Sequence, residues 1–234
     1  MPYGGDETHM QAMPKAVLWD FDGTLVDTEP IWAELEAEML AEHGVVWDDE
    51  MMRSVIGQNA EMTTRQMALS IGQPDRHQDI HRELHARIVG RLLRDGLPFL
   101  PGTLDLIDAA EADGVSAAVV TASNGFIMNA TRELLPPSIQ FVISADDVVN
   151  TKPHPEAYLT AMARLGVAPE ETIVLEDSVP GATSALAAGA FVYAVPALAQ
   201  LDPHPRMVVS ETALRETTWP ELLQIWHDNS KVGI

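Results

Sequence analysis

The chain has 234 residues, 46% of them apolar, which is enough for one compact α/β domain with an insertion or for two small domains. It contains no cysteine, which excludes disulfides and thiolate sites and fits a reducing cytoplasm. Its 35 acidic and 14 basic residues give a formal net charge of −21, which disfavours nucleic acid and anionic lipid as partners. There is neither a secretory signal nor an apolar run of about 18 residues that could cross a membrane. We therefore expect a cytoplasmic protein, without membrane contact, that acts as a monomer.

The first strand of the chain is predicted at residues 15–19, "KAVLW", after a flexible tail over residues 1–13. The strand runs directly into "DFDGTLVD" at residues 20–27. Two acids one residue apart at the end of a buried strand are costly unless they are paired, accept hydrogen bonds or hold a metal. This stretch therefore predicts a site, and the rest of the chain must supply its partners.

Residues 31–97 contain no convincing strand pattern and are predicted to form a helical insertion. Apolar residues recur every four positions within 31–39 and again within 80–88, as on amphipathic helices. Pro30 suits the first turn of a helix, and residues 95–102, "DGLPFLPG", form a turn-rich return. These boundaries predict a core domain of residues 14–30 and 98–234 and a helical cap domain of residues 31–97.

From residue 98 onward, short β-branched runs alternate with helical patterns, which predicts right-handed crossovers and a parallel sheet covered on both faces. The predicted fold class is thus α/β, a Rossmann-like open parallel sheet with helices on both faces and an inserted α-helical cap. The predicted strands span 115–120, 141–144, 172–176 and 191–195, and the predicted helices lie near 103–113, 125–135, 154–165, 180–188 and 219–227.

Polar side chains follow the predicted strands at the edge where open parallel sheets bind their ligands. Four of them are acids, and an oxygen-rich cluster of this kind suits Mg²⁺, a hard cation that prefers carboxylates, water and phosphate oxygens. The candidates, in chain order, are Asp20, Asp22, Thr121, Lys152, Glu176 and Asp177.

These residues resemble, in type and order, the four motifs of the haloacid dehalogenase superfamily of phosphotransferases. The opening motif, residues 20–24, is fairly specific alone, and the four motifs in order are very specific. The stretches "DTEPIW" at 27–32 and "EDSVPGATSALAAG" at 176–189 place the chain near sugar-phosphate phosphatases and β-phosphoglucomutase. The position of the insertion, directly after the first motif, resembles the smaller helical cap type of the family.

The resemblance implies a role for each motif residue. Asp20 would attack phosphorus and form an aspartyl-phosphate, and Asp22 would protonate the leaving oxygen and then activate water. Thr121 would donate a hydrogen bond to the phosphoryl group, while Lys152 would balance its charge. The implied cofactor is Mg²⁺, held by Asp20, the backbone carbonyl of Asp22, Asp177 and, directly or through water, Glu176.

Substrate contacts are expected from the turn after the first motif, from the loop after the second, and from the cap. The sequence cannot name the substrate, because specificity should lie in the cap loop at residues 55–64. The candidate substrate-binding residues are Gly23, Thr24, Ser123, Asn124, Gly57 and Gln58.

The expected function is Mg²⁺-dependent hydrolysis of a small phosphorylated metabolite, a sugar or polyol phosphate, through an aspartyl-phosphate. Asp22 argues against carbon–halogen cleavage, because dehalogenases of this superfamily lack the second acid. A β-phosphoglucomutase-like mutase is the alternative, but that enzyme has a histidine where this chain has Trp32 and an arginine where it has Ala60. A non-catalytic phosphate-binding module is a further alternative, although all the chemical residues are present.

Individually, most of these residues also have a structural explanation. An Asp-Gly pair such as Asp22-Gly23 is a common turn, and a lone lysine is usually an exposed loop charge. Histidines at 77, 81 and 85 share one helical face and could bind a transition metal, but the charged residues between them favour a solvated surface.

Overall fold

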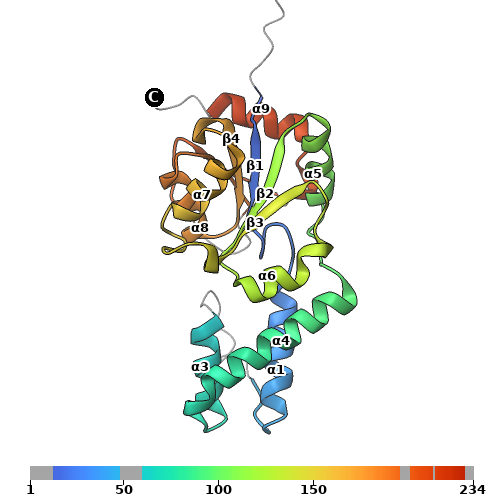
Figure 1. The fold of residues 1–234 in the computed structure, drawn as a ribbon, viewed down its shortest axis with the longest axis vertical. Coiled ribbons are helices and arrows are strands. Elements are labelled where there is room, and N and C mark those ends of the chain that lie inside the picture. The colour runs from blue at the N-terminus through green and yellow to red at the C-terminus, as the bar shows by residue number, and fades with distance from the viewer. Residues whose placement is uncertain (1–12, 48–59, 196–200, 213, 230–234) are drawn as a thin grey trace, which may run out of the picture.

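The computed structural model describes residues 13–47, 60–195, 201–212 and 214–229. Figure 1 shows a parallel sheet flanked by helices and, beyond one end of the sheet, a separate group of helices. These are α1 (Glu29–Ala41), α3 (Ala60–Ser70) and α4 (His77–Asp95), and we call them the helical lobe. The predicted fold class is confirmed.

The sheet has six parallel strands in the order β3-β2-β1-β4-β5-β6. The chain moves outward from β1 to β3 on one side and from β4 to β6 on the other, so the order reverses beside β1. Ligands of open α/β sheets bind beyond the carboxyl ends of the strands at such a point. The strands are β1 (Ala16–Trp19), β2 (Ser116–Val120), β3 (Ile139–Ile143), β4 (Thr172–Glu176), β5 (Phe191–Ala194) and β6 (Met207–Val209).

Alternate strand residues point to opposite faces of the sheet and build two apolar cores. On one face, β1 contributes Val17 and Trp19 to a core covered by α5 (Thr103–Ala112) and α9 (Trp219–Asn229). On the other, Leu18 packs in a core covered by α7 (Glu156–Leu165) and α8 (Val179–Ala187). Every residue of β1 is buried, which explains why the strand is an almost continuous apolar run.

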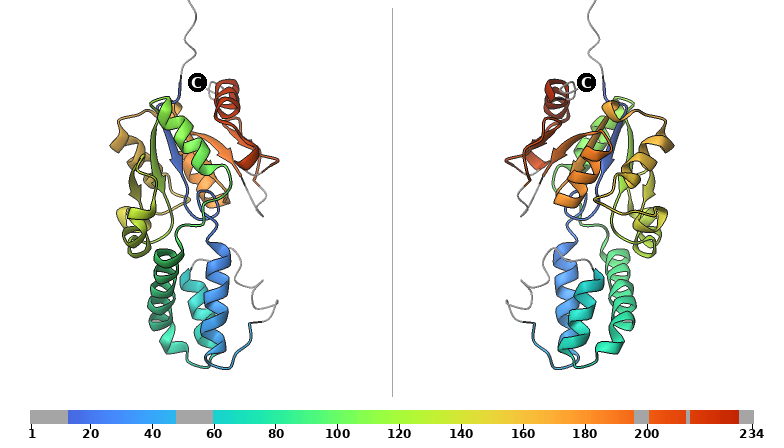
Figure 2. Two further views of the ribbon diagram at one scale, coloured as in Figure 1. Left: turned by 90° about the vertical axis from the view of Figure 1, so that its right-hand side faces the viewer. Right: turned by 90° about the vertical axis from the view of Figure 1, so that its left-hand side faces the viewer.

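The helical lobe has an apolar core of its own, separate from the two cores of the sheet. It includes Leu84 and Ile88 of α4, as the four-residue repeat predicts. Ile127 of α6 (Gly125–Thr131), a helix outside the lobe, also belongs to this core. In Figures 1 and 2 the lobe lies below the sheet, and α4 packs next to α6. The exact division into cap and core domains remains a prediction.

Three local differences from the sequence prediction have physical causes. The predicted helix over 125–135 is α-helical only to Thr131 and continues as a 3₁₀ turn, Arg132–Leu134. It ends before Leu135, which is extended because a residue that precedes proline avoids the α conformation. The short edge strand β6 was not predicted. The prediction of a solvated face at the three histidines was wrong for His85, which is buried with its ring against that of Trp32.

The remaining short elements are 3₁₀ turns, which span Pro74–Arg76, Ala145–Asp147, Pro169–Glu171 and Leu214–Glu216.

In the described ranges, no helix is both long and apolar enough to cross a membrane.

Candidate active site

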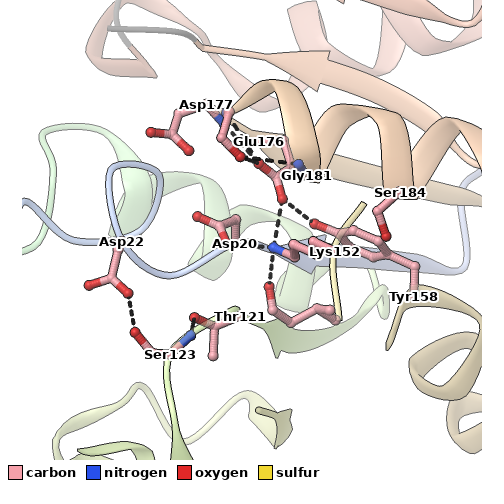
Figure 3. A network of polar contacts seen from close by, with 12 residues as sticks. Asp20, Asp22, Thr121, Ser123, Lys152, Tyr158, Glu176, Asp177, Gly181 and Ser184 are labelled. Atoms are coloured by element: carbon pink, nitrogen blue, oxygen red, sulfur yellow. Dashed lines mark hydrogen bonds and ion pairs between the residues drawn. The ribbon is translucent and has the colours of Figure 1, made fainter. Parts of the chain in front are cut away.

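Asp20 is the first residue after β1 and lies at the centre of the polar network in Figure 3. Its backbone N–H donates to the carbonyl of Leu175 at 3.0 Å, which ties the end of β1 to β4. Its side chain is buried, and one carboxylate oxygen, Oδ1, accepts a hydrogen bond from Lys152 Nζ at 2.6 Å. The sheet therefore presents a fixed carboxylate beside a cation.

Lys152 comes from the loop before α7, and its side chain is 4% exposed. Besides Asp20, its ammonium donates to Glu176 Oε1 at 2.6 Å and to the carbonyl of Val120 at 2.8 Å. Burial alone lowers the pKa of Lys152, but the carboxylates of Asp20 and Glu176 raise it above its usual value. The side chain is therefore charged at neutral pH.

Glu176, the last residue of β4, is fully buried and accepts hydrogen bonds on both carboxylate oxygens. Oε1 accepts from Lys152 and from the hydroxyl of Tyr158 at 2.7 Å. Oε2 accepts from the backbone N–H groups of Asp177 at 3.2 Å and Ser178 at 3.3 Å, and from the Ser178 hydroxyl at 3.1 Å. This carboxylate joins β4, the start of α8, α7 and Lys152.

Asp20, Glu176 and Asp177 each offer a carboxylate oxygen within 4.8 Å of the others. Burial, with the neighbouring Glu176 carboxylate adding to the effect, raises the pKa of Asp177 to about 7. Burial also raises the pKa of Asp20, with Glu176 and Asp177 adding to the effect and Lys152 opposing it. Three crowded carboxylates facing one ammonium form an oxygen donor set that fits a hard divalent cation such as Mg²⁺.

Two glycines allow this cluster to be compact. Gly23 has a φ of +82°, and a Cβ at this position would lie 2.2 Å from Asp177 Oδ2. At Gly181 in α8, a Cβ would lie 1.8 Å from Glu176 Oε1. Side chains at either position would displace an acid of the cluster.

The side chain of Asp22 is turned away from the three clustered acids (Figure 3). Its Oδ2 accepts from the Ser123 hydroxyl at 2.5 Å, and its Oδ1 accepts from the hydroxyl of Thr28. Thr28 directly precedes α1, so Asp22, the second acid of the opening motif, is bonded to the residue at which the helical lobe begins. A metal contact through the backbone carbonyl of Asp22 remains a prediction.

The other predicted site residues occupy different surroundings. Thr121 is buried at the end of β2, and its hydroxyl oxygen accepts from the backbone N–H of Ser123 at 2.9 Å. Asn124 caps α6, because its Oδ1 accepts from the Ile127 N–H at 3.1 Å. Thr24 is fully buried, and its hydroxyl has no hydrogen-bond partner within the described ranges. Gly57 and Gln58 lie outside the described residues.

The network also contains side chains that were not among the predicted residues, including Thr28, Tyr158 and Ser178. A signal for Tyr158 exists, because it falls on the buried face of α7 and a buried phenol usually finds a hydrogen-bond partner. Thr28 carried no signal beyond its place between the motif and the insertion.

Comparison with known proteins gives the family of the chain. Residues 17–195, which contain all the motif residues, match the family described as haloacid dehalogenase-like hydrolase. The chain belongs to this family. The resemblance inferred from the motifs is therefore confirmed, and the chain is a hydrolase.

Relatives of this haloacid dehalogenase-like hydrolase include named phosphatases. Hexitol phosphatase A of Escherichia coli (strain K12) is 31% identical over 182 residues, 77% of this chain and 82% of the relative. Protein CbbY of Rhodobacter capsulatus is 33% identical over 193 residues, 78% and 85% of the two chains. The crystal structure of a CbbY mutant from Rhodobacter sphaeroides in complex with xylulose-(1,5)bisphosphate superposes with a TM-score of 0.69 at 25% identity, covering 87% of this chain and 96% of that one.

Proposed function

We propose that the protein is a magnesium-dependent phosphatase that hydrolyses a sugar or polyol phosphate through an aspartyl-phosphate on Asp20. The observation that carries the proposal is the position of Asp20, which lies at a strand end with Lys152 on one oxygen and two further acids beside it. Its carboxylate is fixed by the sheet, so attack on phosphorus needs little reorganisation.

Each neighbour has a task in this reaction. Lys152 would offset charge on Asp20 and on the transferring phosphoryl group. Asp22 would give a proton to the leaving oxygen and later take one from water. Mg²⁺, held by Asp20, Asp177 and the Asp22 carbonyl with Glu176 alongside, would supply positive charge that lets a phosphate dianion approach the acids.

The names of relatives support a small polyhydroxylated substrate, and the net charge argues against nucleic acid. Relatives of this chain are named a hexitol phosphatase and a phosphorylated carbohydrates phosphatase, and a related CbbY structure contains xylulose-(1,5)bisphosphate. The formal net charge of −21 gives no attraction for nucleic acid. A free small metabolite is the substrate class that fits both.

The mutase alternative is disfavoured by Trp32, which replaces the histidine of β-phosphoglucomutase. In the structure its indole ring is packed edge-to-face on His85, with the ring centroids 5.4 Å apart. An indole cannot accept a proton as an imidazole can. We therefore assign water as the phosphoryl acceptor.

A screen of phosphorylated sugars, polyols, glycolate and nucleotides tests the proposal by measuring inorganic phosphate with Mg²⁺ and with excess chelator. We expect release from one or more polyol or sugar phosphates, only with the metal, and none by freshly purified Asp20→Asn protein. Conversion of a sugar 1-phosphate to its 6-phosphate without phosphate release would instead establish the mutase. Binding without any turnover would establish a phosphate-binding module.

A further inference from the structure

Tyr158 is a fully buried phenol at the back of the candidate site. It lies on α7, and its ring lies below the ammonium of Lys152, with 5.1 Å between Nζ and the ring centroid. Its hydroxyl donates to Glu176 Oε1 at 2.7 Å (Figure 3). The same carboxylate oxygen accepts from Lys152, so Tyr158 and Lys152 meet on one atom.

The geometry around that atom leaves it little freedom. A carboxylate oxygen has about two lone-pair directions, and Tyr158 and Lys152 occupy both on Oε1. Backbone and side-chain donors of residues 177 and 178 hold the other oxygen. Both oxygens of the Glu176 carboxylate are therefore held by hydrogen bonds, and one of these bonds comes from the Tyr158 hydroxyl.

The ammonium of Lys152 is equally constrained. Its three hydrogens match three acceptors, Asp20 Oδ1, Glu176 Oε1 and the Val120 carbonyl. If Glu176 turned, Lys152 could keep that contact only by moving away from Asp20. The place of the cation at the nucleophile therefore depends on the orientation of Glu176.

We propose that Tyr158 is a positioning residue, which acts through Glu176 to hold Lys152 against Asp20. The inference rests on the proposed phosphatase function, in which Lys152 serves the phosphoryl transfer. The hydroxyl of Tyr158 bonds Glu176 and not Asp20. The aromatic ring packs in the core and presents its face to the Lys152 ammonium, whereas the hydroxyl orients the Glu176 carboxylate.

The variant Tyr158→Phe tests this, because it keeps the ring and removes only the hydroxyl. The matched control is Tyr193→Phe, which removes the hydroxyl of another buried tyrosine, one that bonds Ser210 and Thr217 in a different part of the core. Both are compared with the wild-type chain by steady-state kinetics, at a temperature where thermal unfolding shows all three folded, and by crystal structures.

For Tyr158→Phe we expect kcat and kcat/KM to fall together by about 10–100-fold, as when an outer-shell partner of a site is lost, with KM unchanged. In its crystal structure, Nζ should lie beyond hydrogen-bond distance, about 3.5 Å, from Asp20 Oδ1. Tyr193→Phe should match the wild type in both measurements.

Several results would overturn the inference. These are wild-type kcat in Tyr158→Phe, an equal loss in Tyr193→Phe, or a loss of kcat with Lys152 still bonded to Asp20. The proposed function fails separately, if the wild-type chain hydrolyses no phosphate ester with Mg²⁺. In that event the crystal structures still decide whether the hydroxyl positions Lys152.

Discussion

Lys152 lies 2.6 Å from Asp20 although 132 positions separate them in the chain. The pair is buried, with side-chain exposures of 4% and 9%, and the ammonium also serves Glu176. One cation thus neutralises acids at the ends of two neighbouring strands. Its removal would leave both acids buried without a counter-charge.

Replacing Lys152 by alanine should therefore lower the free energy of unfolding by about 3–5 kcal/mol, the usual effect of breaking a buried ion pair from one side. Urea denaturation measures the loss. The control is Lys15→Ala, which removes the 62%-exposed partner of Glu171 and should change stability little. Equal effects of the two substitutions would contradict the importance of burial.

Asp22→Asn should reduce kcat by about 10²–10⁴-fold, because it removes proton transfer but keeps the backbone carbonyl. Stopped-flow or steady-state release of phosphate checks this. An activated ester, whose leaving group needs no proton, should lose less of its rate of Asp20 phosphorylation than an alkyl phosphate. An equal loss for both esters would argue against Asp22 as the general acid.

Gly181→Ala should destabilise the protein by about 1–3 kcal/mol and lower kcat, because the new methyl group would displace the Glu176 carboxylate. The matched control is Gly90→Ala in α4, where a Cβ would meet nothing within 4 Å. There the same substitution should stabilise by about 0.5–1 kcal/mol through helix propensity. Thermal unfolding of the two variants separates the clash from the helix effect.

Chelation should abolish activity and Mg²⁺ should restore it, whereas Ca²⁺, with its larger and looser coordination, should restore little. Asp177→Ala and Gly23→Ala should both raise the Mg²⁺ concentration for half-maximal rate, the second because its methyl group would displace Asp177. Gly114→Ala is the control, since its φ of +75° is similarly strained but a Cβ there meets nothing within 4 Å. If Gly114→Ala raised the Mg²⁺ requirement as much, strain rather than displacement would be the cause.

Glu36 in α1 gives a pH dependence to stability. It is half-buried without a hydrogen-bond or ion-pair partner in the described ranges, and burial raises its pKa from 4.5 to about 7. The folded state therefore holds this proton longer than the unfolded state, so stability falls as pH rises through this interval. Glu36→Gln should remove this loss.

The stabilisation by Glu36→Gln should be small at pH 5 and reach up to about 3 kcal/mol at pH 8, less any screening by water at this partly exposed site. Urea unfolding at the two pH values measures it. Glu38→Gln, on an exposed position of the same helix, should show no such difference. A Glu36→Gln gain that is equal at both pH values would refute the pH effect.

The sequence predicted which polar residues the sheet would bring close together, because the ends of strands can be recognised in it. Buried strands such as β1 and β4 are short apolar runs, and the polar residue after each must lie at the carboxyl edge of a parallel sheet. Edge strand β6 has only three residues, none of them buried, so its pattern is too short to recognise. The predicted helix end at residue 135 was less accurate, because a proline follows it.

Side-chain partnerships were not predictable in the same way. That Glu176 bonds Tyr158, or that Asp22 bonds Thr28, depends on how closely α7 and α1 approach the sheet. Gly181 lets α8 lie close to Glu176, and nothing in a lone glycine inside a helical pattern says which acid will fill its space. His85 was misassigned for the same reason, because the polar residues around it concealed its contact with Trp32.

Ile127 links the helical lobe to α6. It belongs to α6, the helix that starts directly after the loop carrying Thr121 and Ser123, yet its side chain packs in the core of the lobe. Swinging the lobe away would either expose this side chain, at a cost of roughly 1.5–3 kcal/mol, or pull α6 and its loop along. Ile127 would therefore oppose any opening of the lobe by the free energy of burying one isoleucine side chain.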